Sequence, residues 1–262
     1  MTDWLALCRG AVEDVREVLA ELPSRAEREP VLAQGEGGDD TTAIDAAAER
    51  VILARFEGLD ATIVSEEAGE VGAGRQRIVI DPIDGSLNAK RGIPFFSLSI
   101  AVADGATMHD VQFAYVYDFG SGEEWTARRG DGAFLNGERL GAQRPKERIE
   151  ILAFEATLTS EVADKAAAFT GIAYRIRIMG SLALSLCHLA AGRLDAVCSL
   201  KPYRSVDVAA GQLLVLERGL SIANVDGDDA FLAAPLDLVS RSRIAAAGND
   251  DLCRLVVDGL SG

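Results

Sequence analysis

The stretch between residues 96 and 140 constrains the fold most strongly, because short apolar segments and turn residues alternate along its whole length. It contains, in order, FSLSIAVAD, DVQFAYVYD, EEWTARR and GDGAFLNGERL. Segments of this length, rich in β-branched and aromatic residues and bounded by glycine, aspartate or asparagine, are typical of strands joined by tight turns. The stretch therefore predicts an antiparallel meander.

The residues before this meander predict two helices and two strands. Apolar residues recur with helical period over residues 4–22, and a second helix is predicted from about residue 43 to 56. The segments 61–65 and 77–81 are short apolar runs of the kind that form buried strands. The glycine-rich segment GEGGDDTT at 35–42 predicts a mobile loop.

After about residue 148 the pattern changes to alternating strands and helices. The predicted strands IEILAFEA, AYRIRIM and LDAVCSL are separated by a helix over residues 160–169 and by the apolar helix SLALSLCHLAAG. A helix beginning in SVDVAAGQLLVLERG, further strands and a final helix complete the chain. We therefore expect an α/β fold in two halves, residues 1–148 and 149–262, fused into one layered body.

The charge and length of the chain argue against several classes of protein. Its 262 residues carry a formal net charge of −15, whereas nucleic acids and anionic membranes both favour basic surfaces. No stretch approaches the ~20 consecutive apolar residues of a membrane-spanning helix. The N-terminal residues carry acids and arginines at helical spacing, unlike a signal peptide. We therefore expect a cytoplasmic protein that binds neither nucleic acid nor membrane.

Two acids occur at the end of a predicted strand, in DPIDGSLN. Pro82 fixes the backbone between Asp81 and Asp84, Gly85 permits a sharp turn, and Ser86 is placed to cap a short helix. Carboxylates bind hard divalent cations, and amides at a helix N-terminus bind phosphate oxygens. The alternative is a structural turn in which Asp84 and Ser86 are simply cap residues. With only two histidines in the chain, any catalysis is expected to depend on oxygen groups.

Acids in two other segments favour the metal-binding interpretation. Glu66 and Glu67 end the strand predicted at 61–65, so a second strand end presents carboxylates. Asp207 begins a helix in SVDVAAG, where the simpler explanation for a single aspartate is an N-cap. Taken together, the three segments predict a cage for a divalent cation.

The order and wording of these motifs are similar to those of a known family. TIVSEEAGE, IVIDPIDGSLN with GIPFFSLSIAV, the glycine-rich GDGAFLNG and SVDVAAG together resemble the inositol monophosphatase and fructose-1,6-bisphosphatase superfamily over most of the chain. GIPFF, and the lack of a tryptophan before Asp207, look most like the archaeal-type branch with dual specificity. The resemblance implies a layered αβαβα sandwich of the sugar-phosphatase type and a metal-dependent phosphoric monoester hydrolase.

By this resemblance, five residues hold two Mg²⁺ ions, for which Mn²⁺ can substitute. Glu66, Asp81 and the main-chain carbonyl of Ile83 bind the first ion. Asp81 bridges to the second ion, which Asp84 and Asp207 also bind. Paired ions of this kind stabilise both the entering and the leaving oxygen of an in-line displacement.

The resemblance also assigns groups around the attacking water and the phosphate. Ser86 pairs with Asp45 to orient the water, and Glu66 is the third catalytic residue. The alternative for Asp45 is a polar residue near a helix start. The amides of Gly85 and Ser86 bind the phosphate. The GGDD segment at 37–40 corresponds to a segment that approaches a third metal ion in relatives.

Departures from the animal inositol enzymes bear on the substrate. Leu200 stands where that branch has a glutamate that contacts inositol hydroxyls, and Val206 stands where it has tryptophan. An inositol-only specificity is therefore not expected. Gly180 and Ser181 resemble the family's main-chain contact to the sugar or inositol ring. Arginine binds phosphate through two parallel hydrogen bonds, so nearby cations are candidates for a second phosphate, with ordinary surface ion pairs as the alternative. These cations are Arg175, Arg177, Lys201 and Arg204.

These features predict a Mg²⁺-dependent phosphomonoesterase that hydrolyses small polyol or sugar phosphates by two-metal activation of water. Inositol 1-phosphate and fructose 1,6-bisphosphate are the substrates that the resemblance implies. Alternatives within the same class are phosphatases for 3′-phosphoadenosine 5′-phosphate or histidinol phosphate. The alternative from another class is a catalytically silent homologue that regulates a protein partner. The resemblance also implies a homodimer.

Overall fold

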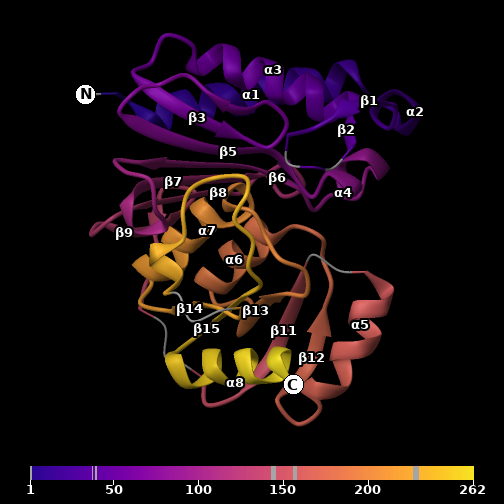
Figure 1. Cartoon of the computed structure of the whole chain (residues 1–262), viewed down its shortest axis with the longest axis vertical. Helices are drawn as coiled ribbons and strands as arrows, with labels where there is room; N and C mark the ends of the chain where they lie inside the picture. Colours follow the sequence, from indigo (N-terminus) through magenta and orange to yellow (C-terminus); the bar gives the residue numbers. More distant parts are fainter. Residues whose placement is uncertain (1, 37, 39, 143–145, 156–157, 227–229) are drawn as a thin grey trace.

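The computed structural model describes residues 2–36, 38, 40–142, 146–155, 158–226 and 230–262. An eight-stranded sheet forms the upper layer of strands in Figure 1. In spatial order its strands are β10 (Glu138–Arg139), β9 (Gly132–Leu135), β8 (Glu124–Arg128), β7 (Val111–Asp118), β6 (Ser97–Ala103), β5 (Gln76–Asp84), β3 (Ala61–Ser65) and β4 (Gly69–Val71). Pairing is antiparallel except between β3 and β5. The predicted antiparallel meander is therefore confirmed.

Two helices, α1 (Trp4–Glu21) and α3 (Ala43–Phe56), cover the outer face of this sheet (Figure 1). In α1 the buried residues recur every three or four positions, which produces a single apolar face. That face and the buried side of α3 pack on isoleucines and tyrosines of β5, β6 and β7. Asp3 caps α1 by accepting a hydrogen bond from the amide of Ala6 at 3.1 Å.

Helices α6 (Leu182–Ala190) and α7 (Ser205–Glu217) cover the inner face of the same sheet. Nearly every residue of both helices is buried, as expected for helices enclosed between two sheets. They approach each other closely at Gly211, where an added Cβ would lie 2.7 Å from the Leu186 side chain. The small residues of SVDVAAG thus permit the central helical layer to pack tightly.

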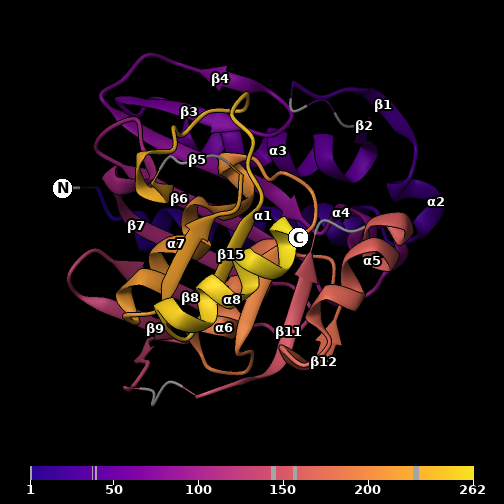
Figure 2. The same ribbon diagram turned by 60° about the horizontal axis from the view of Figure 1, so that its bottom comes forward.

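A five-stranded sheet lies below these helices and is covered in turn by α8 (Asp250–Ser261) and α5 (Thr159–Lys165), as Figures 1 and 2 show. Phe154, Phe169, Leu252 and Val256 belong to the core of this lower part. The layers are therefore helix, sheet, helix, sheet, helix, which confirms the predicted αβαβα sandwich. In spatial order the strands are β12 (Ala173–Arg177), β11 (Ile149–Glu155), β13 (Ala196–Ser199), β15 (Ile244–Ala247) and β14 (Ser221–Asn224).

Smaller elements complete the described chain. The short helices are α2 (Arg25–Arg28), α4 (Ser86–Arg91) and the 3₁₀ turns η1 (Met108–Asp110), η2 (Ala166–Phe169) and η3 (Phe231–Ala233). A two-stranded sheet joins β1 (Val31–Gln34) to β2 (Asp40–Thr42). The loop prediction for 35–42 is therefore wrong over its last three residues, because their partner strand β1 gave no strand signal in the sequence. Gly37 and Asp39 lie outside the described residues.

The first sheet uses residues up to Arg139 and the second begins at Ile149. Helices α6 and α7 nevertheless pack on the first sheet although they belong to the second half of the chain. The division into halves of 1–148 and 149–262 stays a prediction. Among the described residues, none of the helices combines the length and apolar character required to cross a membrane.

Candidate active site

Strand β5 carries two predicted metal ligands to the edge of the inner helical layer. Its pairing with β6 is interrupted between Asp81 and Asp84, which is the stretch containing Pro82. The Asp81 carboxylate accepts a hydrogen bond from the amide of Ile83 at 3.0 Å. Gly85 then adopts a left-handed conformation, with φ of +92°, and α4 begins at the next residue. The sharp turn predicted from DPIDGS is therefore present. The N-cap is Gly85, so the prediction that Ser86 caps this helix is wrong.

Asp84 connects this turn to the beginning of α6. One oxygen of its buried carboxylate accepts a hydrogen bond from the Ser181 hydroxyl at 2.5 Å and another from the amide of Ala183 at 2.7 Å. Ser181 also caps α6 by accepting from the amide of Leu184. The serine predicted to contact substrate thus lies beside a predicted metal ligand.

Glu66 and Asp207 lie on either side of an arginine. The Arg204 guanidinium is 2.5 Å from a Glu66 carboxylate oxygen and 3.4 Å from an Asp207 carboxylate oxygen. The amide of Arg204 also donates to Asp207 at 2.7 Å, so Asp207 belongs to the cap of α7. The simpler N-cap explanation for Asp207 is therefore wrong, because the N-cap is Arg204 and Asp207 is the third residue of the helix. The prediction of Asp207 as a metal ligand stays a prediction.

The carboxylates of the cluster affect one another's ionisation. Burial raises the pKa of Asp81 well above its ordinary value, and the charges of Glu66 and Asp84 raise it further. Burial likewise raises the pKa of Glu66 to about 8, although Arg204 acts to lower it, and raises the pKa of Asp84 to about 7. A cluster of this kind favours additional positive charge, because a nearby cation stabilises the ionised carboxylates.

The oxygen-rich donor set suits a hard divalent cation. One oxygen of the buried Asp45 side chain has no hydrogen-bond partner, which is unusual for a buried carboxylate and leaves it available to a water or an ion. Among the described residues, and in this conformation, no three aspartate, glutamate, histidine or cysteine side chains are close enough together to hold a metal ion. Arg204 contacts two of the predicted ligands in this conformation.

Two predicted catalytic residues have other partners here. The second oxygen of Asp45 accepts hydrogen bonds from the amide of Thr42, at 3.2 Å, and from its hydroxyl. The Ser86 hydroxyl donates to the carbonyl of Ile83 at 2.9 Å. That carbonyl is itself a predicted metal ligand, and its second lone pair can bind a cation while Ser86 keeps its hydrogen bond. The pairing of Ser86 with Asp45 stays a prediction.

Two buried glutamates support the site and were missed by the sequence analysis. Glu49 on α3 accepts hydrogen bonds from the Ser65 hydroxyl at 2.6 Å and from the amides of Glu67 and Ala68 at 3.1 and 2.9 Å. It therefore fixes the turn that carries Glu66. Helical spacing places Glu49 one turn after Asp45, which was the available signal.

Glu155, the second of these glutamates, ends β11 and is 1% exposed. It accepts hydrogen bonds from the amide of Gly180 at 2.8 Å and from the Ser185 hydroxyl at 2.7 Å. Burial raises its pKa to about 7. An acid ending the apolar run IEILAFEA was the signal for this residue.

A cavity of about 680 Å³ opens beside the cluster. Among the residues lining it are Asp84, Glu155, Gly180, Lys201, Arg204 and Asp207. Arg241, which the sequence analysis did not single out, lines it as well. Arg177 lies exposed on β12, where its guanidinium donates to the carbonyl of Ile176, and it is not among the residues lining the cavity. Lys201 and Arg204 are thus better placed than Arg177 to meet a ligand.

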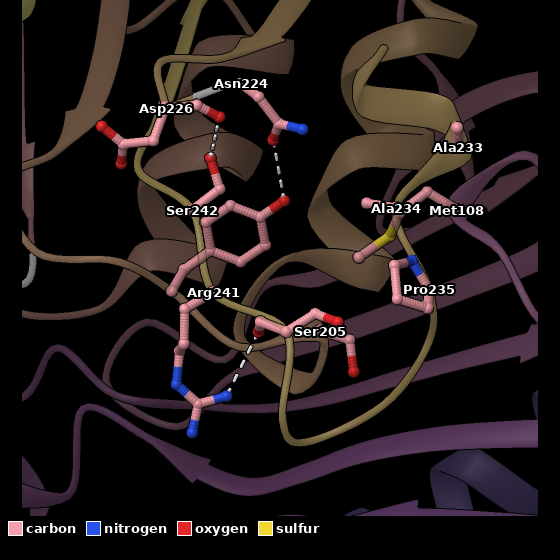
Figure 3. A pocket seen from close by; sticks show the side chains of 11 residues that line it. Met108, Ser205, Asn224, Asp226, Ala233, Ala234, Pro235, Arg241 and Ser242 are labelled. Atoms are coloured by element: carbon pink, nitrogen blue, oxygen red, sulfur yellow. Dashed lines mark hydrogen bonds between the residues drawn. The ribbon is translucent and has the colours of Figure 1, made fainter. Parts of the chain in front are cut away.

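A second cavity, of about 330 Å³, shares Tyr203 and Arg241 with the first. Figure 3 shows side chains that line this second cavity. Several polar groups around it bind one another. The Tyr203 hydroxyl donates to Asn224 at 3.2 Å, and the Ser242 hydroxyl donates to the carbonyl of Asp226 at 3.5 Å. Arg241 lines both cavities, and its guanidinium donates to the carbonyl of Ser240 at 3.2 Å.

Comparison with known proteins places this geometry in a family. The fold and the acids at its strand ends define a phosphatase of the layered α/β class. The inositol monophosphatase family model matches residues 4–259, and the chain belongs to this family. The predicted resemblance and the prediction of a phosphoric monoester hydrolase are therefore confirmed.

Individual relatives agree with this assignment. The fructose-1,6-bisphosphatase/inositol-1-monophosphatase of Archaeoglobus fulgidus is 33% identical over 248 residues, covering 94% of this chain and 93% of the relative. A crystal structure of an inositol monophosphatase–fructose 1,6-bisphosphatase has a TM-score of 0.87 at 27% identity and covers 98% of this chain and 100% of its own. The Nus factor SuhB of Escherichia coli is 33% identical over 232 residues, covering 83% of this chain and 84% of the relative.

Proposed function

We propose that this protein hydrolyses the phosphomonoesters of small polyols and sugars, with inositol 1-phosphate and fructose 1,6-bisphosphate as substrates and Mg²⁺ as cofactor. The observation that carries the proposal is the cluster of buried carboxylates beside a cavity that is also lined by cations. The archaeal relatives, whose names include both activities, support this choice of substrates.

In this proposal Glu66, Asp81, Asp84, Asp207 and the carbonyl of Ile83 hold the divalent cations. When bound, the cations supply positive charge that stabilises the entering and leaving oxygens of the displacement at phosphorus. Mn²⁺, with similar preferences for oxygen ligands, would substitute. The raised pKa values of Glu66 and Asp84 are consistent with carboxylates that require such charge.

The remaining residues position the water and the ester. In this proposal Asp45 accepts a hydrogen bond from the attacking water through its oxygen that has no hydrogen-bond partner, and Ser86 is the second orienting group. The amides of Gly85 and Ser86 face the phosphate, and Gly180 and Ser181 lie against the sugar or polyol. Lys201 and Arg204 provide the positive charge for a second phosphate, as in fructose 1,6-bisphosphate.

A substrate panel tests the proposal directly. The purified protein is incubated with Mg²⁺ and each ester in turn, and released phosphate is measured. The panel contains inositol 1-phosphate, fructose 1,6-bisphosphate, 3′-phosphoadenosine 5′-phosphate and histidinol phosphate. The proposal predicts the highest kcat/KM for the first two. Faster hydrolysis of the nucleotide or of histidinol phosphate would reassign the substrate within the family, and no release with either Mg²⁺ or Mn²⁺ would contradict catalysis.

A regulatory role is the second candidate, because the Nus factor SuhB of Escherichia coli matches most of the chain. Retention of every predicted metal ligand favours the enzyme. Capture of a protein partner together with absence of all ester hydrolysis would favour the regulatory role.

The proposal also includes a cytoplasmic homodimer. Light scattering should then give twice the chain mass of 27.7 kDa. A mass equal to that of a single chain would contradict the dimer.

A further inference from the structure

Arg204 is a cation that already lies within the carboxylate cluster. Its guanidinium is 2.5 Å from Glu66 and 3.4 Å from Asp207, and the three side chains are between 13% and 16% exposed. The ion pair joins the end of β3 to the beginning of α7, two elements from opposite halves of the chain. Ion pairs this well shielded from water are screened much less than surface pairs.

The backbone and the guanidinium of Arg204 are held by different oxygens of the cluster. Its amide is held by Asp207 at 2.7 Å, which anchors the residue at the cap of α7. Arg204 also lines the cavity of about 680 Å³, as does Lys201. The long side chain can therefore point either to Glu66 or into the cavity without any change of the backbone.

A divalent cation and the guanidinium compete for the same oxygens. Mg²⁺ binds carboxylate oxygens at about 2.0–2.1 Å in a near-octahedral arrangement, which leaves little room for an arginine on the same face. Two cations sharing one carboxylate also repel each other, and the repulsion is stronger in a partly buried site than in water. Cation binding at Glu66 and Asp207 must therefore displace Arg204 from Glu66.

We propose that Arg204 is a built-in counter-ion that competes with the divalent cation for Glu66 and Asp207 and that turns into the cavity when the cation binds. There it becomes a ligand for a phosphate group of the substrate, which is the second phosphate in fructose 1,6-bisphosphate. This inference rests on the proposed metal site. It has two consequences: Arg204 lowers the affinity of the protein for the cation, and it makes the binding of cation and phosphate mutually favourable, because each stabilises the same displaced side chain.

The first experiment measures cation affinity by calorimetry, with the EDTA-treated full-length protein titrated with Mn²⁺. Arg204→Gln is expected to bind Mn²⁺ about tenfold more tightly than wild type, within the usual range of coupling between sites. Lys201→Gln is the matched control, because it removes one positive charge from the same cavity. Among the described residues Lys201 forms no ion pair with a carboxylate, and its effect is expected to be less than about twofold, as for screened surface charges.

The outcomes separate this inference from the proposed function. If wild type binds Mn²⁺ and Arg204→Gln binds it equally or more weakly, the proposal that Arg204 competes with the cation is contradicted. An equal gain in Mn²⁺ affinity in Arg204→Gln and Lys201→Gln would also contradict it, because the effect would then come from the net charge of the cavity alone. Failure of the wild type to bind Mn²⁺ at all would instead contradict the proposed metal site.

A second measurement distinguishes competition from a structural role. Without metal, Arg204→Gln should unfold at a lower temperature than wild type, whereas saturating Mn²⁺ should bring the two together. Inorganic phosphate should raise Mn²⁺ affinity less in Arg204→Gln than in wild type. A stability loss that persists in Mn²⁺, or an unchanged phosphate effect, would contradict the proposal. Should Arg204→Gln fail to fold, Arg204→Lys replaces it, because lysine keeps the charge but not the planar guanidinium. Its Mn²⁺ affinity is then expected to lie between that of wild type and the tenfold tighter binding expected for Arg204→Gln.

Discussion

A Cβ atom added to Gly85 would lie 2.9 Å from the carbonyl oxygen of Gly180, so the backbones of these two turns are in direct contact. Gly85 follows β5 in the first sheet, and Gly180 precedes α6 in the second half of the chain. Asn88 strengthens the junction by donating hydrogen bonds to the carbonyls of Phe95 and Met179, both at 2.8 Å. The predicted phosphate turn and the predicted sugar contact therefore have a fixed separation.

Replacing Gly85 by alanine is expected to disrupt this junction. Gly171→Ala is the matched control, because Gly171 has a similar φ of +85° but open space around it. We expect Gly171→Ala to cost about 1–2 kcal/mol from the left-handed conformation alone. Gly85→Ala should lose a further ~1–3 kcal/mol, because its Cβ meets backbone atoms that cannot move aside. Urea unfolding gives both values; equal losses would show that the contact does not matter.

Asp84→Asn tests the metal site with little effect on the fold. An asparagine oxygen can still accept the hydrogen bonds from Ser181 and Ala183, so the free energy of unfolding should change little. Loss of the negative charge should reduce Mg²⁺-dependent phosphate release by more than about 100-fold. This is more than the loss of about 10–100-fold that is typical when a residue that only supports a metal ligand is replaced. Asp251→Asn, at an exposed acid of α8, is the control and should retain full activity. Retained activity in Asp84→Asn would support the purely structural turn.

Glu49→Ala tests whether the turn carrying Glu66 must be held in place. The change leaves the buried Ser65 hydroxyl and two backbone amides without an acceptor, which should cost about 1–3 kcal/mol. Mn²⁺ affinity should fall about 10–100-fold, as for other supporting partners of metal ligands.

Asp195→Ala is the control for Glu49→Ala, because Asp195 accepts the amides of Glu150 and Ile151 at 2.9 and 2.8 Å in the second sheet. It should lose stability without loss of Mn²⁺ affinity in calorimetry. Unchanged affinity in Glu49→Ala would show that the Glu66 turn holds its shape unaided.

Glu155 should make the stability of the metal-free protein depend on pH. Burial raises its pKa from an ordinary 4.5 to about 7, so the folded state retains a proton that the unfolded state has lost between these values. The stabilising contribution is therefore complete below pH ~4.5 and is lost as the pH rises towards ~7. A shift of this size corresponds to at most about 3 kcal/mol.

Glu155→Gln cannot ionise and should lose less stability than wild type over this pH range. Urea unfolding in EDTA at several pH values between 5 and 8 measures the difference. Parallel pH curves for the two proteins would mean that Glu155 does not carry this proton.

The secondary structure was predictable because its signals are local. The period of the apolar residues located α1, and the regular turn residues located the meander of β6 to β9. The strand formed by the last residues of 35–42 was not predicted, because β2 depends on its pairing with β1 and a three-residue strand has no period of its own. The predicted helix over 160–169 ends as an α-helix at Lys165 and continues as the 3₁₀ turn η2.

The sequence singled out the acids of the candidate site, whose role as metal ligands stays a prediction, but it did not indicate their partners. Asp81 and Asp84 stand out because a buried strand has no structural need for two carboxylates. The partners depend on contacts across the fold: Asp45 binds Thr42 rather than Ser86 in this conformation, and Glu155 binds Gly180. No local pattern reports such contacts, because each joins residues that come together through the packing of separate elements.

The sequence by itself determined the alternation of helices and strands, the chemical character of the site and the family to which the chain belongs. These depend on the identity and spacing of neighbouring residues. The tertiary structure alone decided that Arg204 reaches Glu66, that Glu49 holds the Glu66 turn and that Gly85 touches Gly180. Such relationships arise when two sheets close on a shared helical layer, and their distances follow from how the side chains of that layer pack.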